Sequence, residues 1–306
     1  MLCAPSLLVA INRIMETISM SQNTPNNVRR NLQYLARLDE WDDVKPFQIV
    51  GTLNPGQPRE NFKFETHSTT IYNARSSGHS EFSLGTCGFE WVKHETKEDL
   101  SSTESIDRYI LEVSELVRLK LNAKMVKPYQ YQIRDRDRDG SDLTIRLPSG
   151  FIHIGERLHS SLSCLPLTII DVTPEAARNR VKHSFPNHFD RILGGGFRFL
   201  SIWRPLFGPV KDNTLALCDS RSINDEDLIE SDHIYPDFES ETYMAFFAPG
   251  HKWYYLEDQM PDEVLLITNY DSSSETRVLH SGFDLQAPGQ YEKGRQSIEV
   301  KIVVAD

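Results

Sequence analysis

Two segments of this sequence have residue types that could bind an ion or a phosphate, but their spacing argues against both. Residues 133–142, IRDRDRDGSD, alternate acidic and basic side chains. A calcium-binding EF-hand needs a fixed order of oxygen ligands and a closing glutamate, and both are absent here. We therefore interpret this segment as a charged turn. Gly194–Phe197 (GGGF) predicts a turn before a strand and not a phosphate-binding loop, because no helix pattern follows it.

The cysteines and most histidines also lack the spacing of a metal or redox site. The cysteines are widely separated, form no CxxC pair and predict reduced thiols in a cytoplasmic protein: Cys3, Cys87, Cys164 and Cys218. His153, His159 and His183 have no ligand-like spacing, so we interpret them as ordinary surface or core residues. The apolar run from Leu7 to Ile11 lacks a basic flank and is too short to cross a bilayer, so we expect no secretory signal and no membrane partner.

Charge and composition narrow the class of partner. The 306 residues carry a formal net charge of −11, with 39% hydrophobic and 25% charged residues, which is ordinary for a globular protein. Nucleic-acid binding depends on Lys and Arg neutralising phosphates, so an acidic chain argues against a polyanion partner. A small organic substrate is expected instead, and a homo-oligomer is compatible with the sequence.

The domain organisation is predicted to be simple. Residues 21–32, SQNTPNNVRRNL, are polar and rich in turn-forming residues, so residues 1–40 are expected to form a flexible N-terminal segment. Residues 41–306 have the length that all-β barrels and sandwiches often use for one domain. We therefore predict a single domain over this range.

The elements that must position any site are mainly short strands. Many segments of alternating apolar and polar residues are separated by Gly, Pro, Asp and Asn, which predicts a sandwich or a barrel. Apolar residues recur at helical spacing from Ile106 to Val117, and Ser101 or Ser102 precedes them as an N-cap. Residues 173–185, TPEAARNRVKHSF, predict a second helix. The fold class is therefore mainly β with flanking helices.

Six segments together resemble a fungal and bacterial family of natural-product tailoring proteins that includes gibberellin desaturase and the aspergillic acid hydroxylase/desaturase. In order, they cover most of residues 70–304: NARSSGHSEFSLGTCGFEWVKHET, YILEVSELVRLKLNAKMVKPYQYQIR, SIWRPLFGPVKDNTLALCDSRSI, HKWYYLEDQMPDEVLLITNYDS, LHSGF and RQSIEVKIVV. The resemblance implies a double-stranded β-helix, or jelly-roll, barrel of the 2-oxoglutarate oxygenase type. It also implies that the mouth of the barrel holds Fe(II) and 2-oxoglutarate.

The family's site has three metal ligands, a His-x-Asp/Glu on one strand and a distal His, which leave positions open for 2-oxoglutarate and oxygen. By resemblance, His280 in LHSGF is the distal histidine and Asp171 in TIIDV is the acidic ligand. Arg295 is similar to the arginine whose fork pairs with the far carboxylate of 2-oxoglutarate, with Ser297 as its companion.

The sequence departs from the family pattern at three positions. Ile169 stands where the first metal-binding histidine is expected, and isoleucine has no lone pair to offer. Tyr131 stands where the family tends to have histidine, and Ser201 where it tends to have asparagine. Residues 201 and 203 share one strand face, so Trp203 is predicted to face the pocket. Arg204 points the other way in a regular strand and is expected to pair with a carboxylate such as Asp219.

A second His-x-Asp sequence, His188-Phe189-Asp190, also precedes His280 and Arg295. If it were the metal motif, the iron site would be complete. It lies among a proline and three glycines, which favour a loop over a barrel strand. We therefore interpret this match as a coincidence.

The missing histidine leads to the prediction of an enzyme that uses no cofactor. A barrel without its metal keeps an apolar cavity that can hold two reactive partners together. The sequence is similar to the branch of fungal tropolone-sesquiterpenoid pathways, which implies a hetero-Diels–Alder cycloaddition between an o-quinone methide and a humulene-type terpene. His280, Arg295, Tyr131 and Asp171 are the expected catalytic groups.

The expected substrate-binding residues are Ile169, Ser201, Trp203 and Ser297. Two alternatives to the cycloaddition remain open. The first is an Fe(II)/2-oxoglutarate-dependent hydroxylase or desaturase of a secondary metabolite. The second is a non-catalytic partner of an active oxygenase.

Overall fold

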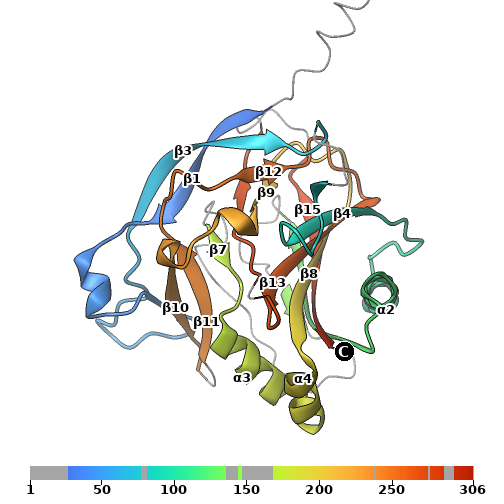
Figure 1. The fold of residues 1–306 in the computed structure, drawn as a ribbon, viewed down its shortest axis with the longest axis horizontal. Helices are drawn as coiled ribbons and strands as arrows, with labels where there is room; N and C mark the ends of the chain where they lie inside the picture. Colours follow the sequence, from blue (N-terminus) through green and yellow to red (C-terminus); the bar gives the residue numbers. More distant parts are fainter. Residues whose placement is uncertain are drawn as a thin grey trace, which may run out of the picture.

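The fold is built from two β-sheets that face each other, as the computed structural model shows (Figure 1). The structure describes residues 27–76, 81–135, 144–146, 168–236, 239–274, 276–285 and 293–305. Within them, strands dominate and helices flank the sheets, which agrees with the predicted mainly β fold. No helix of this described part is long and apolar enough to cross a membrane.

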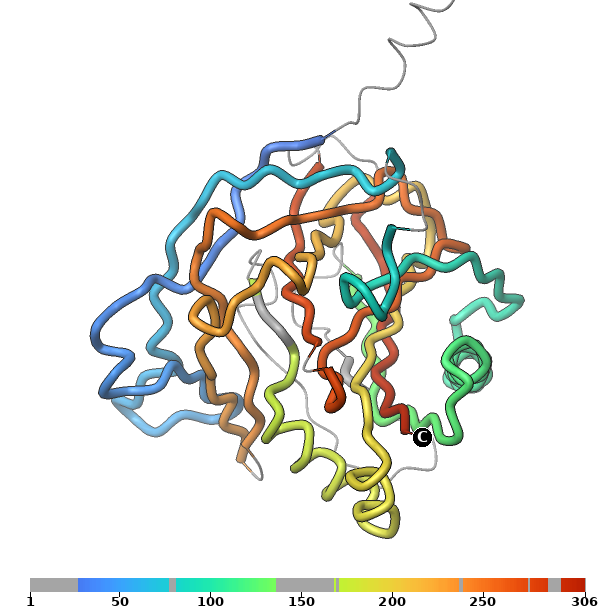
Figure 2. Tube along the Cα trace, in the orientation of Figure 1, coloured from blue at the N-terminus to red at the C-terminus, as the bar shows by residue number. Residues whose placement is uncertain are grey.

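The first sheet has six strands. Their order is β4 (Phe89–Lys93), β13 (Glu263–Asp271), β8 (Phe197–Pro205), β15 (Gln296–Ala305), β5 (Met125–Asp135) and β6 (Thr144–Arg146). β8 and β15 are far apart in the sequence but pair antiparallel from Ser297 to Ala305, and they lie side by side (yellow and dark red in Figure 2). The register places Ser201 opposite Lys301 and Trp203 opposite Glu299.

The second sheet has nine strands. Their order is β1 (Val28–Leu35), β3 (Phe64–Asn73), β12 (Trp253–Tyr255), β9 (Thr214–Cys218), β14 (His280–Phe283), β7 (Ile169–Ile170), β11 (Glu239–Ala245), β10 (Leu228–Ile234) and β2 (Phe47–Ile49). Apolar side chains fill part of the space between the two sheets. Leu217 of β9 packs in one cluster with Trp203, Leu265 and Ile267 of the six-stranded sheet.

Helix α2 (Thr103–Leu121) covers the outer face of the six-stranded sheet, the face turned away from the second sheet (Figure 1). Its N-cap is Ser102, whose hydroxyl accepts a hydrogen bond from the backbone N–H of Ser105 at 3.2 Å. The apolar stripe of the helix packs on apolar side chains of β8, β13 and β15. The helix predicted from the spacing of Ile106 to Val117 is confirmed.

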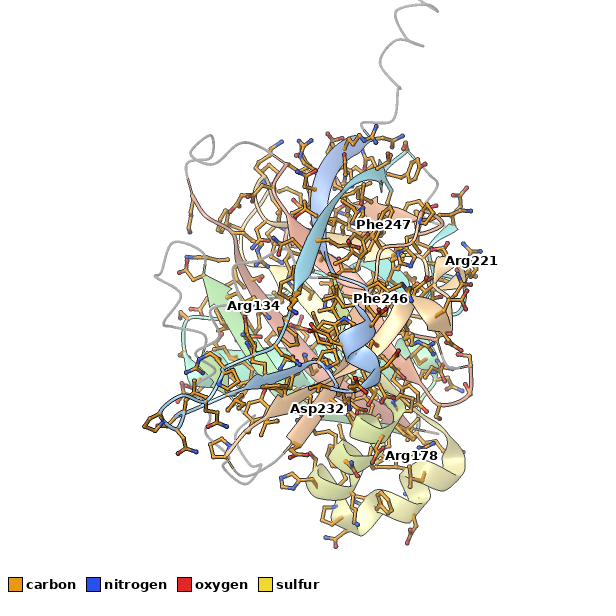
Figure 3. All side chains as sticks on the ribbon, turned by 90° about the vertical axis from the view of Figure 1, so that its left-hand side faces the viewer. Arg134, Arg178, Arg221, Asp232, Phe246 and Phe247 are labelled. Carbon is orange, nitrogen blue, oxygen red and sulfur yellow. The ribbon has the colours of Figure 1, made fainter. Side chains whose placement is uncertain are left out.

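Helices α3 (Pro174–Ser184) and α4 (Phe189–Gly195) cover one end of the barrel, where Figure 3 shows Arg178 on the surface. Thr173 caps α3 by accepting a hydrogen bond from the backbone N–H of Ala176. Beneath these helices lies an apolar cluster that includes Phe197 and Phe199 of β8. The helix predicted from residues 173–185 is confirmed. Short 3₁₀ segments are η1 (Asp39–Asp42), η4 (Pro186–His188), η5 (Ser220–Ser222) and η6 (Asp225–Asp227).

The N-terminal boundary differs from the prediction. β1 (Val28–Leu35) lies inside the segment expected to be flexible, yet it pairs with β3 over all eight residues. Leu32, Tyr34 and Leu35 are buried: Leu32 and Tyr34 pack in one apolar cluster, and Leu35 packs in another. Because the residues before Leu32 are mostly polar, the sequence pattern did not predict this strand. Cys3, Cys164, His153, His159 and most of the charged turn of residues 133–142 lie outside the described residues, whereas Cys87 and Cys218 are buried free thiols.

Candidate active site

β7 and β14 bring Asp171 and His280 together inside the barrel. The two strands pair antiparallel with His280 opposite Ile169, and Asp171 follows β7 directly. His280 Nε2 lies 3.6 Å from Asp171 Oδ1, and both side chains are largely buried. Asp171 and His280 are more than a hundred positions apart in the sequence, yet they form a carboxylate–imidazole pair, as the resemblance implied.

Lys301 reaches the same carboxylate from the opposite sheet. Its Nζ lies 2.8 Å from Asp171 Oδ2 and 3.9 Å from Glu299 Oε1. Burial alone would raise the pKa of the Asp171 carboxyl, but the charges of Lys301 and His280 outweigh it and hold that pKa well below its usual range. Burial acts on Lys301 in the opposite direction, and the charges of Asp171 and Glu299 raise its pKa overall. Both groups are therefore charged at neutral pH.

Polar contacts continue from Lys301 across the six-stranded sheet. Ser201 Oγ donates a hydrogen bond to Glu299 Oε1 at 2.6 Å and accepts one from Asn269 Nδ2 at 2.9 Å. Among the residues that the structure describes, Asn269 Oδ1 is buried without a hydrogen-bond partner. We call Asn269, Ser201, Glu299, Lys301, Asp171 and His280 the polar chain of the barrel. It runs from β13 on one sheet to β14 on the other.

The protonation of His280 follows from its neighbours. Burial lowers the pKa of the imidazole, but the charge and hydrogen bond of Asp171, with a further contribution from Glu299, raise it overall. Nδ1 lies 3.3 Å from the carbonyl oxygen of Val278, which fixes that nitrogen as the donor. Nε2 therefore faces Asp171 and is the ring nitrogen available to a ligand.

Arg295, Ser297 and Trp203 form a second cluster on the same inner face. Arg295 Nη1 donates to Ser297 Oγ at 3.0 Å, and the backbone N–H of Arg295 donates to Asp212 Oδ2 at 3.0 Å. The guanidinium carbon lies 5.7 Å from the centre of the Trp203 ring. Ser297 and Lys301 are four residues apart on β15, so about 13 Å of strand separates the two clusters.

Tyr131 is not part of this site. It pairs with Val300 and is buried in the apolar cluster under α2, on the outer face of the six-stranded sheet. A register shift between Lys301 and Ile302 leaves an extra residue in β5, and the inward aromatic residue is Tyr129. Burial raises the pKa of Tyr129 to about 12. The prediction of Tyr131 as a hydrogen-bond donor to a substrate is therefore wrong.

Arg204 and the second His-x-Asp sequence also lie away from the polar chain. Arg204 points outward as predicted but does not pair with Asp219. It donates to the Tyr109 hydroxyl at 2.9 Å and contacts His94. His188-Phe189-Asp190 falls at the junction of η4 and α4 rather than on a barrel strand, and the side chains of His188 and Asp190 are exposed.

Comparison with known proteins decides the family. The model of the oxidoreductase/YMDC permease-like domain matches residues 32–305. The chain belongs to this family. It is 29% identical over 315 residues to the hydroxylase/desaturase CTB9 of Cercospora beticola. The matched region covers 93% of this chain and 89% of that protein. The chain is also 29% identical over 269 residues to the Fe(II)/2-oxoglutarate-dependent dioxygenase nvfI of Aspergillus novofumigatus, with 83% and 88% covered.

A solved structure matches the whole barrel. The iron and alpha-ketoglutarate-dependent endoperoxidase NvfI superposes with a TM-score of 0.74 at 26% identity, over 91% of this chain and 98% of that one. The predicted double-stranded β-helix of the 2-oxoglutarate oxygenase type is therefore confirmed. The chain is an enzyme of this oxygenase-like group, whose curated relatives belong to fungal secondary metabolism.

These findings correct the predicted activity. Relatives and structural neighbours are named as iron- and 2-oxoglutarate-dependent enzymes. The prediction of a cofactor-independent hetero-Diels–Alder reaction is therefore wrong, and so is the expectation of no cofactor. The prediction gave the loss of one histidine at position 169 more weight than the retention of Asp171, His280 and Arg295. The alternative reading, a 2-oxoglutarate-dependent oxygenase, is the better supported one.

The residues present fit the cofactors of this family in part. Asp171 and His280 offer a carboxylate oxygen and an imidazole nitrogen, both of which suit iron. Among the described residues, no group of three His, Cys, Asp or Glu side chains could hold a metal ion. The backbone of Ile169 takes the place opposite His280 where the resemblance expects a histidine. Arg295 with Ser297 fits the carboxylate of 2-oxoglutarate.

Lys301, Glu299 and Asn269 were not predicted as site residues from the sequence. A signal for two of them was present, because Glu299 and Lys301 alternate with Ile298, Val300 and Ile302 in β15. Alternation places both charged residues on one face. That face points into the barrel, since the apolar residues between them pack under α2.

Proposed function

We propose that this chain is an Fe(II)/2-oxoglutarate-dependent hydroxylase or desaturase that acts on a small organic secondary metabolite held inside the barrel. The observation that carries the proposal is the Asp171–His280 pair, brought together by β7 and β14 in a barrel that is similar to a solved iron-dependent endoperoxidase along its length. Arg295 supports it as a candidate carboxylate-binding group on the same face.

The chain's own residues have distinct roles in this proposal. When bound, Fe(II) would allow O2 to act as the oxidant for C–H chemistry, with 2-oxoglutarate as the co-reductant that is converted to succinate and CO2. Asp171 and His280 Nε2 contribute two metal ligands, and Val278 orients the imidazole through its carbonyl. The Arg295 guanidinium binds the far carboxylate of 2-oxoglutarate, with Ser297 and the Trp203 ring fixing its direction.

Anaerobic titration of the full chain with Fe(II) and then 2-oxoglutarate tests the proposal. A visible charge-transfer absorption that needs both additions is expected, because it reports 2-oxoglutarate bound at iron. Arg295→Met should weaken 2-oxoglutarate binding by at least about tenfold, since a charge-assisted hydrogen bond is removed. Arg118→Met is the matched control, because Arg118 is an exposed residue of α2 whose guanidinium pairs with Glu115. Failure of wild type to bind iron or develop the absorption would overturn the proposal.

A further inference from the structure

Lys301 is the member of the polar chain that contacts Asp171 directly, and the proposed oxygenase activity gives it no role. Its ammonium lies 2.8 Å from Asp171 Oδ2, which is one of the two oxygen atoms that a metal ion would take. The side chains of Lys301 and Asp171 are only 18% and 14% exposed. A positive charge is therefore already present at the carboxylate.

The fold holds the lysine in this place. β15 has Ile298, Val300 and Ile302 on its outer face, packed under α2, so Lys301 must point into the barrel. A buried ammonium needs a paired carboxylate, because leaving it alone costs several kcal/mol. Asp171 supplies that pairing from the opposite sheet.

Lys301 also has a second partner within reach. Glu299 lies two residues earlier on the same face of β15, with its Oε1 3.9 Å from the ammonium. Ser201 donates a hydrogen bond to that same oxygen atom and so keeps the Glu299 side chain in place. A small rotation of the lysine side chain would move its charge from Asp171 toward Glu299 without exposing it to water.

We propose that Lys301 competes with a divalent metal ion for Asp171, and that the metal binds when the ammonium moves to Glu299. This inference rests on the proposed function, because it assumes that Asp171 and His280 are metal ligands. In the absence of metal, the Lys301 ammonium pairs with the Asp171 carboxylate and neutralises its charge. A metal ion in the same place would be repelled by a cation about 4 Å away, and this repulsion is strong where water is scarce. The lysine and its alternative partner thus set the metal affinity.

Titration of the full chain with Co(II), followed by visible absorption and isothermal calorimetry, tests the competition without any turnover. Lys301→Met keeps the length of the side chain and removes the charge, so it should bind Co(II) at least about tenfold more tightly than wild type. Lys301→Arg keeps the charge and should bind as weakly as wild type. Lys93→Met is the matched control, because Lys93 pairs with Asp262 at 2.9 Å on the surface.

Glu299→Gln tests the second half of the proposal. It removes the charge that accepts the displaced ammonium, so it should weaken Co(II) binding, opposite in sign to Lys301→Met. A purely structural role for the two residues would not give opposite signs. Asp171→Asn in the Lys301→Met background should abolish the gain, which assigns the bound ion to this site.

The outcomes separate this inference from the proposed function. Equal Co(II) affinity in wild type and Lys301→Met would overturn the competition and leave the metal site standing. Absence of Co(II) binding in both proteins would overturn the metal site itself, and the competition with it. If Lys301→Met does not fold, Lys301→Gln keeps a hydrogen-bond donor toward Asp171 and carries the same expectation, with folding checked by thermal unfolding.

Discussion

The two faces of the six-stranded sheet differ sharply in chemistry. On the outer face, Ile202 and Val300 pack with their neighbours under α2 in a continuous apolar layer. On the inner face, the same two strands carry Ser201, Glu299 and Lys301, which belong to the polar chain. Because side chains alternate along a strand, one sequence serves both faces at once. The outer face packs against α2, and the inner face carries the candidate site.

The polar groups of the two faces also differ in how completely they are paired. On the outer face, Arg204 donates to the Tyr109 hydroxyl at 2.9 Å and to the Pro261 carbonyl at 2.6 Å, and it contacts His94 Nδ1 at 2.6 Å. On the inner face, within the described residues, Asn269 Oδ1 has no partner. A closed network rigidifies a core, whereas an open one leaves groups for a ligand.

The largest expected effect is on the stability of the metal-free protein, and it comes from a substitution on the inner face. Asp171→Ala removes the nearest carboxylate of both Lys301 and His280, and it leaves the mostly buried ammonium with the more distant Glu299 alone. The free energy of unfolding should fall by about 3–5 kcal/mol, as is typical when one member of a buried ion pair is removed. Urea unfolding followed by circular dichroism measures this. Asp262→Ala, which removes one of the two carboxylates beside the exposed Lys93, is the control and should change stability far less. Equal losses in the two variants would mean that the inner pair is not buried in solution.

Adjacent residues of β8 sharpen the comparison with a smaller effect. Ile202→Ala opens a cavity in the apolar layer under α2 and should cost about 3 kcal/mol of unfolding free energy. Ser201→Ala, one residue earlier and on the inner face, removes one hydrogen bond to Glu299 and one from Asn269, and should cost about 1–2 kcal/mol. Chemical denaturation of both variants measures the difference. A larger loss from Ser201→Ala would reverse the assignment of the two faces.

The sequence predicted those features that depend on local patterns. The Ser102 cap and the apolar spacing predicted α2, and alternation placed Ser201 and Trp203 on one inward face. The resemblance placed Asp171 and His280 at positions that the sheet brings together. Each of these needs only strand or helix periodicity, or a short motif.

The remainder depends on packing that local patterns do not encode. The extra residue of β5 near Tyr129 turns Tyr131 away from the site, and nothing in PYQYQIR reveals that shift of register. Arg204 contacts Tyr109 across 95 positions of sequence. The partner of Lys301 lies on the other sheet, so its role appears only when the barrel is closed.

The smallest expected effects are on the pKa values of two histidines, one on each face of the six-stranded sheet. The two pKa shifts have opposite signs. On the outer face, burial and the nearby Arg204 charge lower the pKa of His94 below its ordinary value of 6.5. On the inner face, burial acts in the same direction, but Asp171 outweighs it and raises the pKa of His280 above 6.5. Histidine-ring NMR spectra of the metal-free protein, assigned with His94→Gln and His280→Gln, should therefore give one midpoint on each side of 6.5.

The pH dependence of the free energy of unfolding should follow the signs of these two pKa shifts. His94 binds its proton more weakly when folded, so its contribution is present above pH 6.5 and is lost as the pH falls. His280 binds its proton more strongly when folded, so its contribution is complete below pH 6.5 and is lost as the pH rises through the folded pKa. Relative to wild type, His94→Gln should therefore gain stability from about pH 7 to about pH 5, and His280→Gln should lose it. Parallel trends in the two variants would mean that Asp171 does not act on His280, and the inner pair on which the proposed metal site depends would not exist in solution.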